Sequence, residues 1–491
     1  MSPSYRLSKS RYTAGLQCHK LLWWRVHEPD APELVPDPAT QAIFDQGTRV
    51  GALARTYVPG GTLVDFPWNE TQKKLEATAA ALAAGAPVVY EASFSAGGVF
   101  AAVDILERVP GGLGLVEVKS GTSAKPEYLQ DAAVQAHVLA QAGHEVRRVE
   151  IMHLNRACTF PDLSDLFTRA DVTGAVAELL PDVPAQVRAQ LRMLEGPLPE
   201  VPIGPRCSAP YACPFRARCW AGVPDDHVST LYRIGKKAWD LEAQGYRAIR
   251  DLPATLGLNA TAERQRLAVT EGRVVVEPTL REALRTFQPP LAFLDFETIN
   301  PAIPAWDGCH PYDNLPVQFS CHRQGRDGAC EHLEWLAEGP GDPRPALAGA
   351  LIAACADART IVAYNASFER TCLENLGAAL GGSVALELGD IEKHLVDLLP
   401  VVRDHVYHPG FGGGFGLKAV LPALVPELSY DGMEIAEGDA ATRALERLLL
   451  RGETLAAAER ARLREALLSY CERDTWAIVK LLERLRELAG G

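Results

Sequence analysis

The stretch Leu291-Ala-Phe-Leu-Asp295-Phe-Glu297-Thr-Ile299 decides how the carboxyl-terminal part of the chain folds. Apolar residues run through it almost without interruption, which predicts a buried strand. Asp295 and Glu297 break that run, and both lie on one face because side chains alternate along a strand. Two neighbouring carboxylates in an apolar strand repel each other unless a cation neutralises them. The stretch therefore predicts a divalent-metal site on a buried strand.

The residues after this strand supply further acidic groups. The sequence predicts strands at 316–322, 331–336 and 361–365, a helix capped by Asn365, and a long helix at 455–488. Glu369 falls in the first turn of the capped helix. Tyr470 and Asp474 are four residues apart, and so share one face of the long helix. A glycine-rich loop at 409–418 is predicted to be either a base-stacking segment, through its phenylalanines, or a mobile surface loop.

A second acidic pattern lies nearer the amino terminus. Helices are predicted at 71–84 and 128–142, with strands at 88–94, 98–106 and 114–119 between them. Asp104 is on the second strand, Glu117 and Lys119 share a face of the third, and Gln135 is on the following helix. Such carboxylates can hold a metal while the lysine positions water or neutralises developing charge, as metal-assisted phosphodiester cleavage requires.

Length, composition and charge limit the class of protein. The 491 residues suit two or three domains, and 47% hydrophobic with 23% charged residues is ordinary for a soluble protein. No signal peptide and no run of about 18 apolar residues is present, which predicts a cytoplasmic protein without a membrane span. The net charge of -13 argues against a chain coated with DNA-binding surface, but it permits a local basic groove.

Four of the eleven cysteines form a candidate metal-binding set. Cys207, Cys213 and Cys219 are equally spaced in a proline-containing loop, and Cys18, on a helix predicted to start at Ser8 or Ser10, can supply a fourth thiolate. Four thiolates hold either an iron-sulfur cluster or a structural zinc ion. Disulfides are not expected in a cytoplasmic chain.

Asp104, Glu117-Val-Lys119 and Gln135 together resemble the core of PD-(D/E)XK nucleases, specifically the RecB-like branch. This resemblance implies that Asp104 and Glu117 bind metal, that Lys119 and Gln135 are catalytic, and that Cys18, Cys207, Cys213 and Cys219 hold a [4Fe-4S] cluster. Many members carry a histidine ligand on the helix before the strands. Residues 46–54 contain none, and Glu91 is the candidate substitute.

Asp295, Glu297, Asn365-Ala-Ser-Phe-Glu369, Tyr470 and Asp474, in this order, resemble the DnaQ-like exonucleases of the DEDD superfamily, Tyr subtype. The resemblance implies that the four acids bind two metal ions, Mg²⁺ or Mn²⁺, and that Tyr470 orients or deprotonates the attacking water. Glu369 stands where the family usually has aspartate. Asp397 matches an accessory acid with a structural role. The run from 294 to 304 also resembles an uncharacterised bacterial family that joins the two nuclease types.

The predicted fold class is α/β, with a RecB-like PD-(D/E)XK domain followed by an RNase H-like domain of the DnaQ type. The expected boundaries are 1–225, a helical linker at 226–288 with a faint likeness to helix-hairpin-helix elements, and 289–491. The resulting hypothesis is a nuclease that cuts DNA at single strands or ends in repair, recombination or defence. The alternatives are a nucleic-acid-binding scaffold with one or both centres inactive, and an exonuclease that trims RNA.

Overall fold

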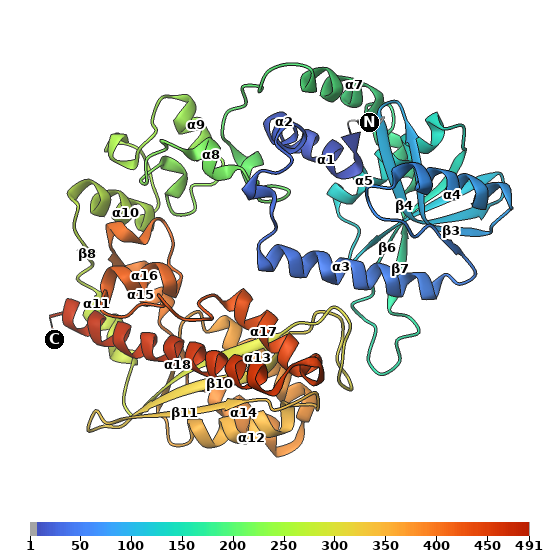
Figure 1. The fold of residues 1–491 in the computed structure, drawn as a ribbon. Coiled ribbons are helices and arrows are strands. Elements are labelled where there is room, and N and C mark those ends of the chain that lie inside the picture. Colours follow the sequence, from blue (N-terminus) through green and yellow to red (C-terminus); the bar gives the residue numbers. More distant parts are fainter. Residues whose placement is uncertain (1–6, 491) are drawn as a thin grey trace. The chain divides into compact units, whose positions relative to one another are not determined.

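The computed structural model describes residues 7–490 and has a mixed α/β structure, which confirms the predicted class (Figure 1). The chain divides into two compact units, residues 1–221 with 302–304, and residues 222–301 with 305–491. Within residues 7–490, no helix combines the length and the apolar character needed to cross a membrane.

The first unit is built on a mixed seven-stranded sheet. Its strand order is β2-β3-β4-β5-β6-β7, with β1 parallel to β4. The central hairpins β3-β4 and β4-β5 are antiparallel. The strand β5 pairs in parallel with β6, and the helix α5 (Pro126–Gln141) connects the two strands. The strands are β1 (Leu7–Ser8), β2 (Thr62–Leu63), β3 (Val88–Ala96), β4 (Val99–Val109), β5 (Gly112–Lys119), β6 (Val146–Leu154) and β7 (Phe167–Asp171).

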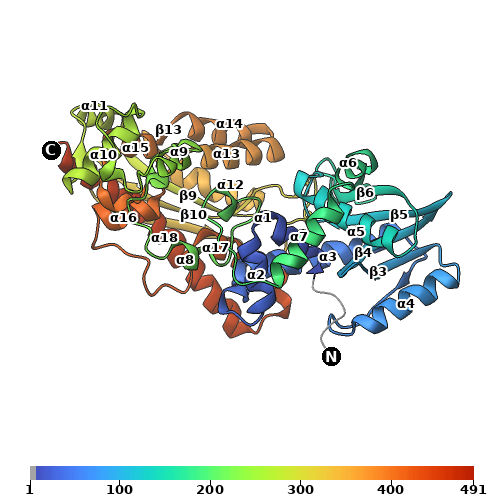
Figure 2. The same cartoon turned by 90° about the horizontal axis from the view of Figure 1, so that it is seen from above.

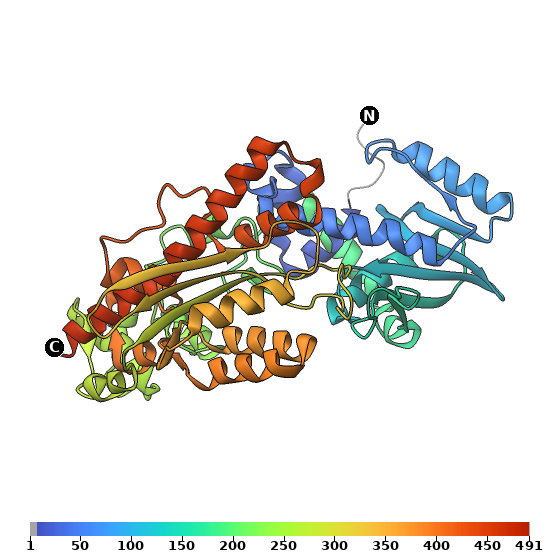
Figure 3. The ribbon, with the colours of Figure 1, turned by 90° about the horizontal axis from the view of Figure 1, so that it is seen from below.

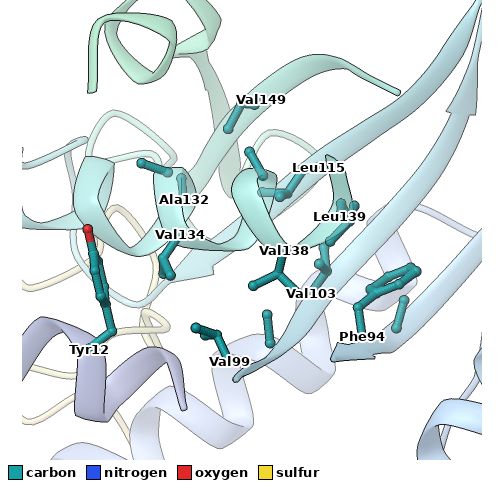
Figure 4. Packing of buried hydrophobic residues seen from close by; sticks show 14 of the residues in the cluster. Tyr12, Phe94, Val99, Val103, Leu115, Ala132, Val134, Val138, Leu139 and Val149 are labelled. Atoms are coloured by element: carbon teal, nitrogen blue, oxygen red, sulfur yellow. The ribbon is translucent and has the colours of Figure 1, made fainter. Parts of the chain in front are cut away.

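Helices cover both faces of this sheet. The helix α5 packs on one face, where Val134, Val138 and Leu139 meet Val103 and Leu115 of the strands (Figure 4). Ala54 of α3 packs on the other face, in a smaller cluster with residues of β3, β4, β5 and β6. The helices of this unit are α1 (Lys9–Gln17), α2 (His19–His27), α3 (Pro38–Tyr57), α4 (Thr71–Ala83), α5 (Pro126–Gln141), α6 (Thr173–Leu179), α7 (Val183–Leu194) and α8 (Arg216–Trp220).

The second unit is built on a five-stranded sheet in the order β11-β10-β9-β12-β13. The strand β9 (Leu291–Ile299) is at the centre, as its apolar run predicts, and every residue of it except Asp295 is buried. It pairs antiparallel with β10 and parallel with β12. The other strands are β10 (Leu315–Gln324), β11 (Cys330–Leu336), β12 (Thr360–Ala363) and β13 (Leu395–Asp397).

The two faces of this sheet carry different helices. The long helix α18 (Ala457–Leu488) crosses one face, and α12 (Arg344–Cys355) and α13 (Ser367–Leu380) cover the other (Figure 3). The helix α14 (Gly382–Lys393) lies beside α13 (Figure 2). The remaining helices are α15 (Leu399–His405), α16 (Leu417–Leu424) and α17 (Gly438–Leu450). Asp295 and Glu297 alternate with residues packed under α12 and α13, so they face α18.

The segment between the predicted nuclease domains clusters with the second unit. It contains α9 (Lys237–Ala243), α10 (Ala260–Glu271), α11 (Leu280–Ala283) and the strand β8 (Val275–Val276), which pairs antiparallel with β14 (Val406–Tyr407). Two short helices were expected at 231–253. Only α9 forms as an α-helix there, and the second expected helix is a single 3-10 turn at Ile249–Asp251.

Three local expectations differ from the structure. The helix expected at 8–24 starts after Ser8, whose hydroxyl accepts a hydrogen bond from Arg11 N, but it breaks at Cys18, where the backbone is extended. Asn365 does not cap α13: it has a positive φ of 74°, and Ala366 is the N-cap. The loop at 409–418 is neither mobile surface nor base-stacking segment, because Phe411 and Phe415 are buried in the core.

Candidate functional site

Four cysteines from separate segments of the first unit line one cavity. Cys18 lies at the break between α1 and α2, Cys207 ends a 3-10 turn, Cys213 lies in the next loop, and Cys219 is on α8. All four are free thiols. Gln17 of α1 connects this helix to the loop that contains Cys207 and Cys213. Its Nε2 donates hydrogen bonds to two carbonyls of that loop, at 2.8 and 2.7 Å.

The donor set of this cavity fits a bound metal group. Burial raises the pKa of Cys213, and the neighbouring Cys18, Cys207 and Cys219 raise it further. Thiolates held this close repel each other, so their deprotonated forms need a cation between them. Four sulfur ligands suit an iron-sulfur cluster or a structural zinc ion.

The first carboxylate centre lies on one row of the sheet in the first unit. One acid from each of three adjacent strands lies next to the paired row of Tyr90, Ile105 and Val116: these acids are Glu91 of β3, Asp104 of β4 and Glu117 of β5. The ladder between β4 and β5 ends at the Ile105 row. Beyond it, Asp104 Oδ2 accepts a hydrogen bond from Val118 N at 2.6 Å, so a side chain takes the place of a backbone partner.

Glu91 has an unusual backbone. Its φ of 57° is rare for a residue with a side chain, and such strain concentrates at functional positions. Burial raises the pKa of Glu91, and Glu117 adds to this rise, while Arg55 opposes it. Arg55 Nη1 is 3.6 Å from Glu91 Oε1. Glu91 is therefore an acid held close to the two predicted ligands.

Two lysines neutralise Glu117. Lys9 Nζ of α1 is 2.6 Å and Lys119 Nζ is 2.9 Å from the same oxygen, Oε1. Gln135 Nε2 donates to the other oxygen at 2.7 Å, and Lys119 also pairs with Asp131 Oδ2 at 2.6 Å. The structure thus brings together Glu117, Lys119 and Gln135 as predicted, and it adds Lys9.

The two predicted metal ligands of this centre differ in proton affinity. Burial and the charge of Glu117 raise the pKa of Asp104 to about 7, although Lys9 opposes them. Burial also disfavours the charged form of Glu117, but Lys9 and Lys119 outweigh it and lower the pKa to about 2. In the absence of metal, the centre therefore holds one ionised acid, and a second that is half protonated near neutral pH.

The second carboxylate centre gathers acids from three elements of the second unit. Asp295 and Glu297 come from β9, Glu369 from the first turn of α13 and Asp474 from α18. Glu297, Glu369 and Asp474 are at most 8% exposed. Glu369 Oε2 has no hydrogen-bond partner among the described residues. A buried carboxylate oxygen without a donor is unfavourable in the metal-free protein, and a metal ion would satisfy it.

Burial raises the pKa values of these acids, and repulsion from neighbouring acids adds to this rise. For Asp295, burial is the largest cause, followed by Asp474, Glu297 and Glu369. Burial and Asp474 raise the pKa of Glu297 to about 8, and burial with Asp397 raises that of Glu369 to about 8. Acids that interact in this way, from separate segments of chain, are the oxygen ligands that Mg²⁺ and Mn²⁺ prefer.

Tyr470 lies beside these acids and its phenol is already engaged. Lys418 Nζ donates a hydrogen bond to Tyr470 Oη at 3.0 Å, and Tyr470 also hydrogen-bonds Asp474. Burial, together with Asp474, Glu297 and Asp295, raises the pKa of the phenol. Tyr470 is therefore neutral at physiological pH and can orient a water molecule through its hydroxyl, while its role as a base is disfavoured.

Among the residues of this centre, sequence reasoning missed Tyr430 and misplaced Lys418. Tyr430 Oη donates a short hydrogen bond to Asp474 Oδ1. Lys418 was expected to be part of the glycine-rich loop, but it is the second residue of α16, 4.9 Å from the ring centre of Tyr470. Its charge opposes the rise in the pKa values of Glu297 and Asp474 that burial causes. Neither residue carries a local signal, because each meets its partner only in the folded chain.

The comparisons with known proteins cover only part of the chain. A family model described as a domain of unknown function, DUF2779, matches residues 292–415. This match spans about a quarter of the chain and includes Asp295, Glu297 and Glu369, but it ends before Tyr470 and Asp474. No curated protein matches the sequence.

Proposed function

We propose that this protein is a metal-dependent nuclease that hydrolyses DNA phosphodiester bonds at single strands or ends. In this proposal the second unit is a DnaQ-like exonuclease of the DEDD Tyr type, and the first is a RecB-like PD-(D/E)XK nuclease with a [4Fe-4S] cluster. The observation that carries it is the group of four interacting acids, Asp295, Glu297, Glu369 and Asp474, whose pKa values are all raised. Such a group is costly unless cations bind it.

The residues of the second centre have separate tasks in this proposal. The four acids would hold Mg²⁺ or Mn²⁺, which would supply Lewis-acid polarisation of the phosphate and activation of a water molecule. Tyr470 orients that water, and Lys418 fixes Tyr470 by donating to its oxygen. Tyr430 holds Asp474 in place. Lys418 also provides a positive charge near the acids, where a phosphate group would approach.

The first centre supports the proposal less strongly. Glu117 is already neutralised by Lys9 and Lys119, so a metal must compete with two ammonium groups for it. This observation favours the alternative in which the first unit binds nucleic acid without cutting it. The row of Glu91, Asp104 and Glu117 favours catalysis, because it offers three acids, with Glu91 in the place of the absent histidine.

The test uses full-length protein carrying Lys119→Ala, so that only the second centre is active. Single-stranded DNA and RNA with a 5′ label are incubated with Mg²⁺ or Mn²⁺, and the products are separated by length. Stepwise shortening is expected for DNA, and adding Asp295→Asn should abolish it. Glu387→Gln, on the exposed surface of α14, is the matched control and should leave the ladder unchanged. If neither polymer shortens with either metal, the second unit is not a nuclease.

A further inference from the structure

A second group of metal-ligand side chains lies on the same sheet, outside the carboxylate centre. His322 of β10 and His332 of β11 are directly opposite each other. Their rings are 4.6 Å apart between centroids, with 29° between their planes. Glu472 of α18 lies above this pair, and its Oε1 is 3.7 Å from His332 Nδ1. One ligand atom from each of the three residues lies within 4.8 Å of the others.

Each histidine has one ring nitrogen engaged with a hydroxyl. His332 Nε2 is 2.9 Å from Ser320 Oγ, and His322 Nδ1 is 2.8 Å from Thr475 Oγ1. Ser320 and Thr475 are themselves 2.7 Å apart. Metal-binding histidines usually donate one N–H to such an oxygen, which fixes the ring and leaves the other nitrogen to bind the ion. With this assignment of the protons, His332 Nδ1 is the free nitrogen, and it is the one that faces Glu472.

We infer that His322, His332 and Glu472 form a binding site for a transition-metal ion of the Zn²⁺ class. Two imidazoles and one carboxylate match the preferences of zinc, whereas Mg²⁺ and Ca²⁺ prefer oxygen ligands. The side chain of Glu472 is 52% exposed, so it is free to turn towards the rings, and water can reach a fourth coordination position. The bound ion requires ligand atoms closer than 4.8 Å, at roughly 2 Å from the metal. A turn of the Glu472 side chain, with a tilt of the His332 ring out of its stack on His322, provides this geometry.

The position of this site suggests what the ion does. Glu472 follows Cys471 and precedes Asp474 on α18, so the ion would tie this helix to β10 and β11. The same stretch of α18 carries Tyr470 and Asp474. A metal ion bound here would fix the position of the helix that carries these two residues. The observations that support this metal site are distances and side-chain contacts, and they hold whether or not the protein is a nuclease.

The test measures zinc bound per chain. Purified full-length protein is dialysed against micromolar Zn²⁺ with millimolar Mg²⁺ as a competitor for the carboxylate centres, and zinc is counted by elemental analysis. His332→Ala and Glu472→Ala should each bind one zinc ion fewer than the parent, or bind it at least about 10-fold more weakly. His394→Ala, an exposed histidine at the end of α14, is the matched control and should bind as the parent does. The cysteine cluster contributes equally to all four proteins.

Cobalt distinguishes this site from the cysteines. Thiolate ligands give Co²⁺ an intense ultraviolet charge-transfer band, and nitrogen and oxygen ligands do not. The cobalt that Glu472→Ala fails to bind should lack this band. Equal zinc binding by all variants, or loss of cobalt that has the thiolate band, would overturn the inference. Glu472 is half exposed, so Glu472→Ala decides the question even if His332→Ala does not fold.

Discussion

Replacing Glu369 with glutamine should make the metal-free protein more stable and weaken its response to metal. The side chain is 2% exposed, and its Oε2 lacks a hydrogen-bond partner within the described chain. Burial and the charge of Asp397 raise the pKa of Glu369 to about 8. The glutamine has nearly the same shape, but it carries no charge at any pH.

The pKa shift sets the size and sign of this effect. A carboxyl group with a raised folded-state pKa contributes stability that is fully present below its unfolded pKa, near 4.5, and is lost as the pH rises to about 8. At pH 7 this loss amounts to roughly 3 kcal/mol for Glu369. Glu369→Gln removes it, so the free energy of unfolding should rise by up to about 3 kcal/mol at pH 7 and hardly change at pH 4.

Urea unfolding at both pH values, with EDTA and then with Mn²⁺, measures this effect. The parent should lose stability with rising pH in EDTA and regain it with Mn²⁺, because the ion replaces the protons on the acids. Glu369→Gln should show a flatter pH dependence and a smaller gain from Mn²⁺. Glu387→Gln is the control and should behave as the parent. If Glu369→Gln is less stable in EDTA at pH 7 and gains as much from Mn²⁺ as the parent, the reasoning about this centre is wrong.

The other predictions concern the remaining residues of the three sites. Asp104→Asn in an Asp295→Asn background should abolish any DNA cleavage that remains in that background, and cleavage at the parental rate would show that the first centre is not catalytic. Cys207→Ser should remove the brown colour of anaerobically purified protein and lower the free energy of unfolding by up to about 5 kcal/mol, as expected for loss of a cross-link to Cys18; stoichiometric zinc without iron in the parent would exclude the cluster. Tyr470→Phe should slow DNA shortening by no more than about 100-fold, because the metals stay in place, whereas Asp474→Asn should abolish it; equal loss in both variants would contradict the orienting role.

Local sequence patterns predicted most of the elements that hold the site. The apolar run of β9 and its two acids are visible in nine residues, and strand alternation alone puts both acids on one face. The four-residue spacing of Tyr470 and Asp474 likewise needs only the helix of α18. These features depend on neighbours in the chain, and therefore they can be read from sequence.

The partners of these residues depend on the folded chain. Lys9 and Glu117 are 108 residues apart in sequence, and Tyr430 and Asp474 are 44 apart. No periodicity connects such residues, because the contact arises only when separate elements pack. The row of Glu91, Asp104 and Glu117 is different: it depends on the register of two hairpins, which the tight turns between their strands largely set.

The two carboxylate centres differ in how their charges are neutralised. In the first, Lys9 and Lys119 lie against Glu117 and keep it ionised, so this acid is neutralised without a metal. In the second, Lys418 opposes the charges of Glu297 and Asp474, yet the pKa values of all four acids remain raised. A metal ion that binds Glu117 in the first centre must displace an internal cation, whereas at the second centre the ion replaces protons. The second centre therefore has the larger electrostatic gain from Mg²⁺ or Mn²⁺, and this difference makes it the stronger candidate for catalysis.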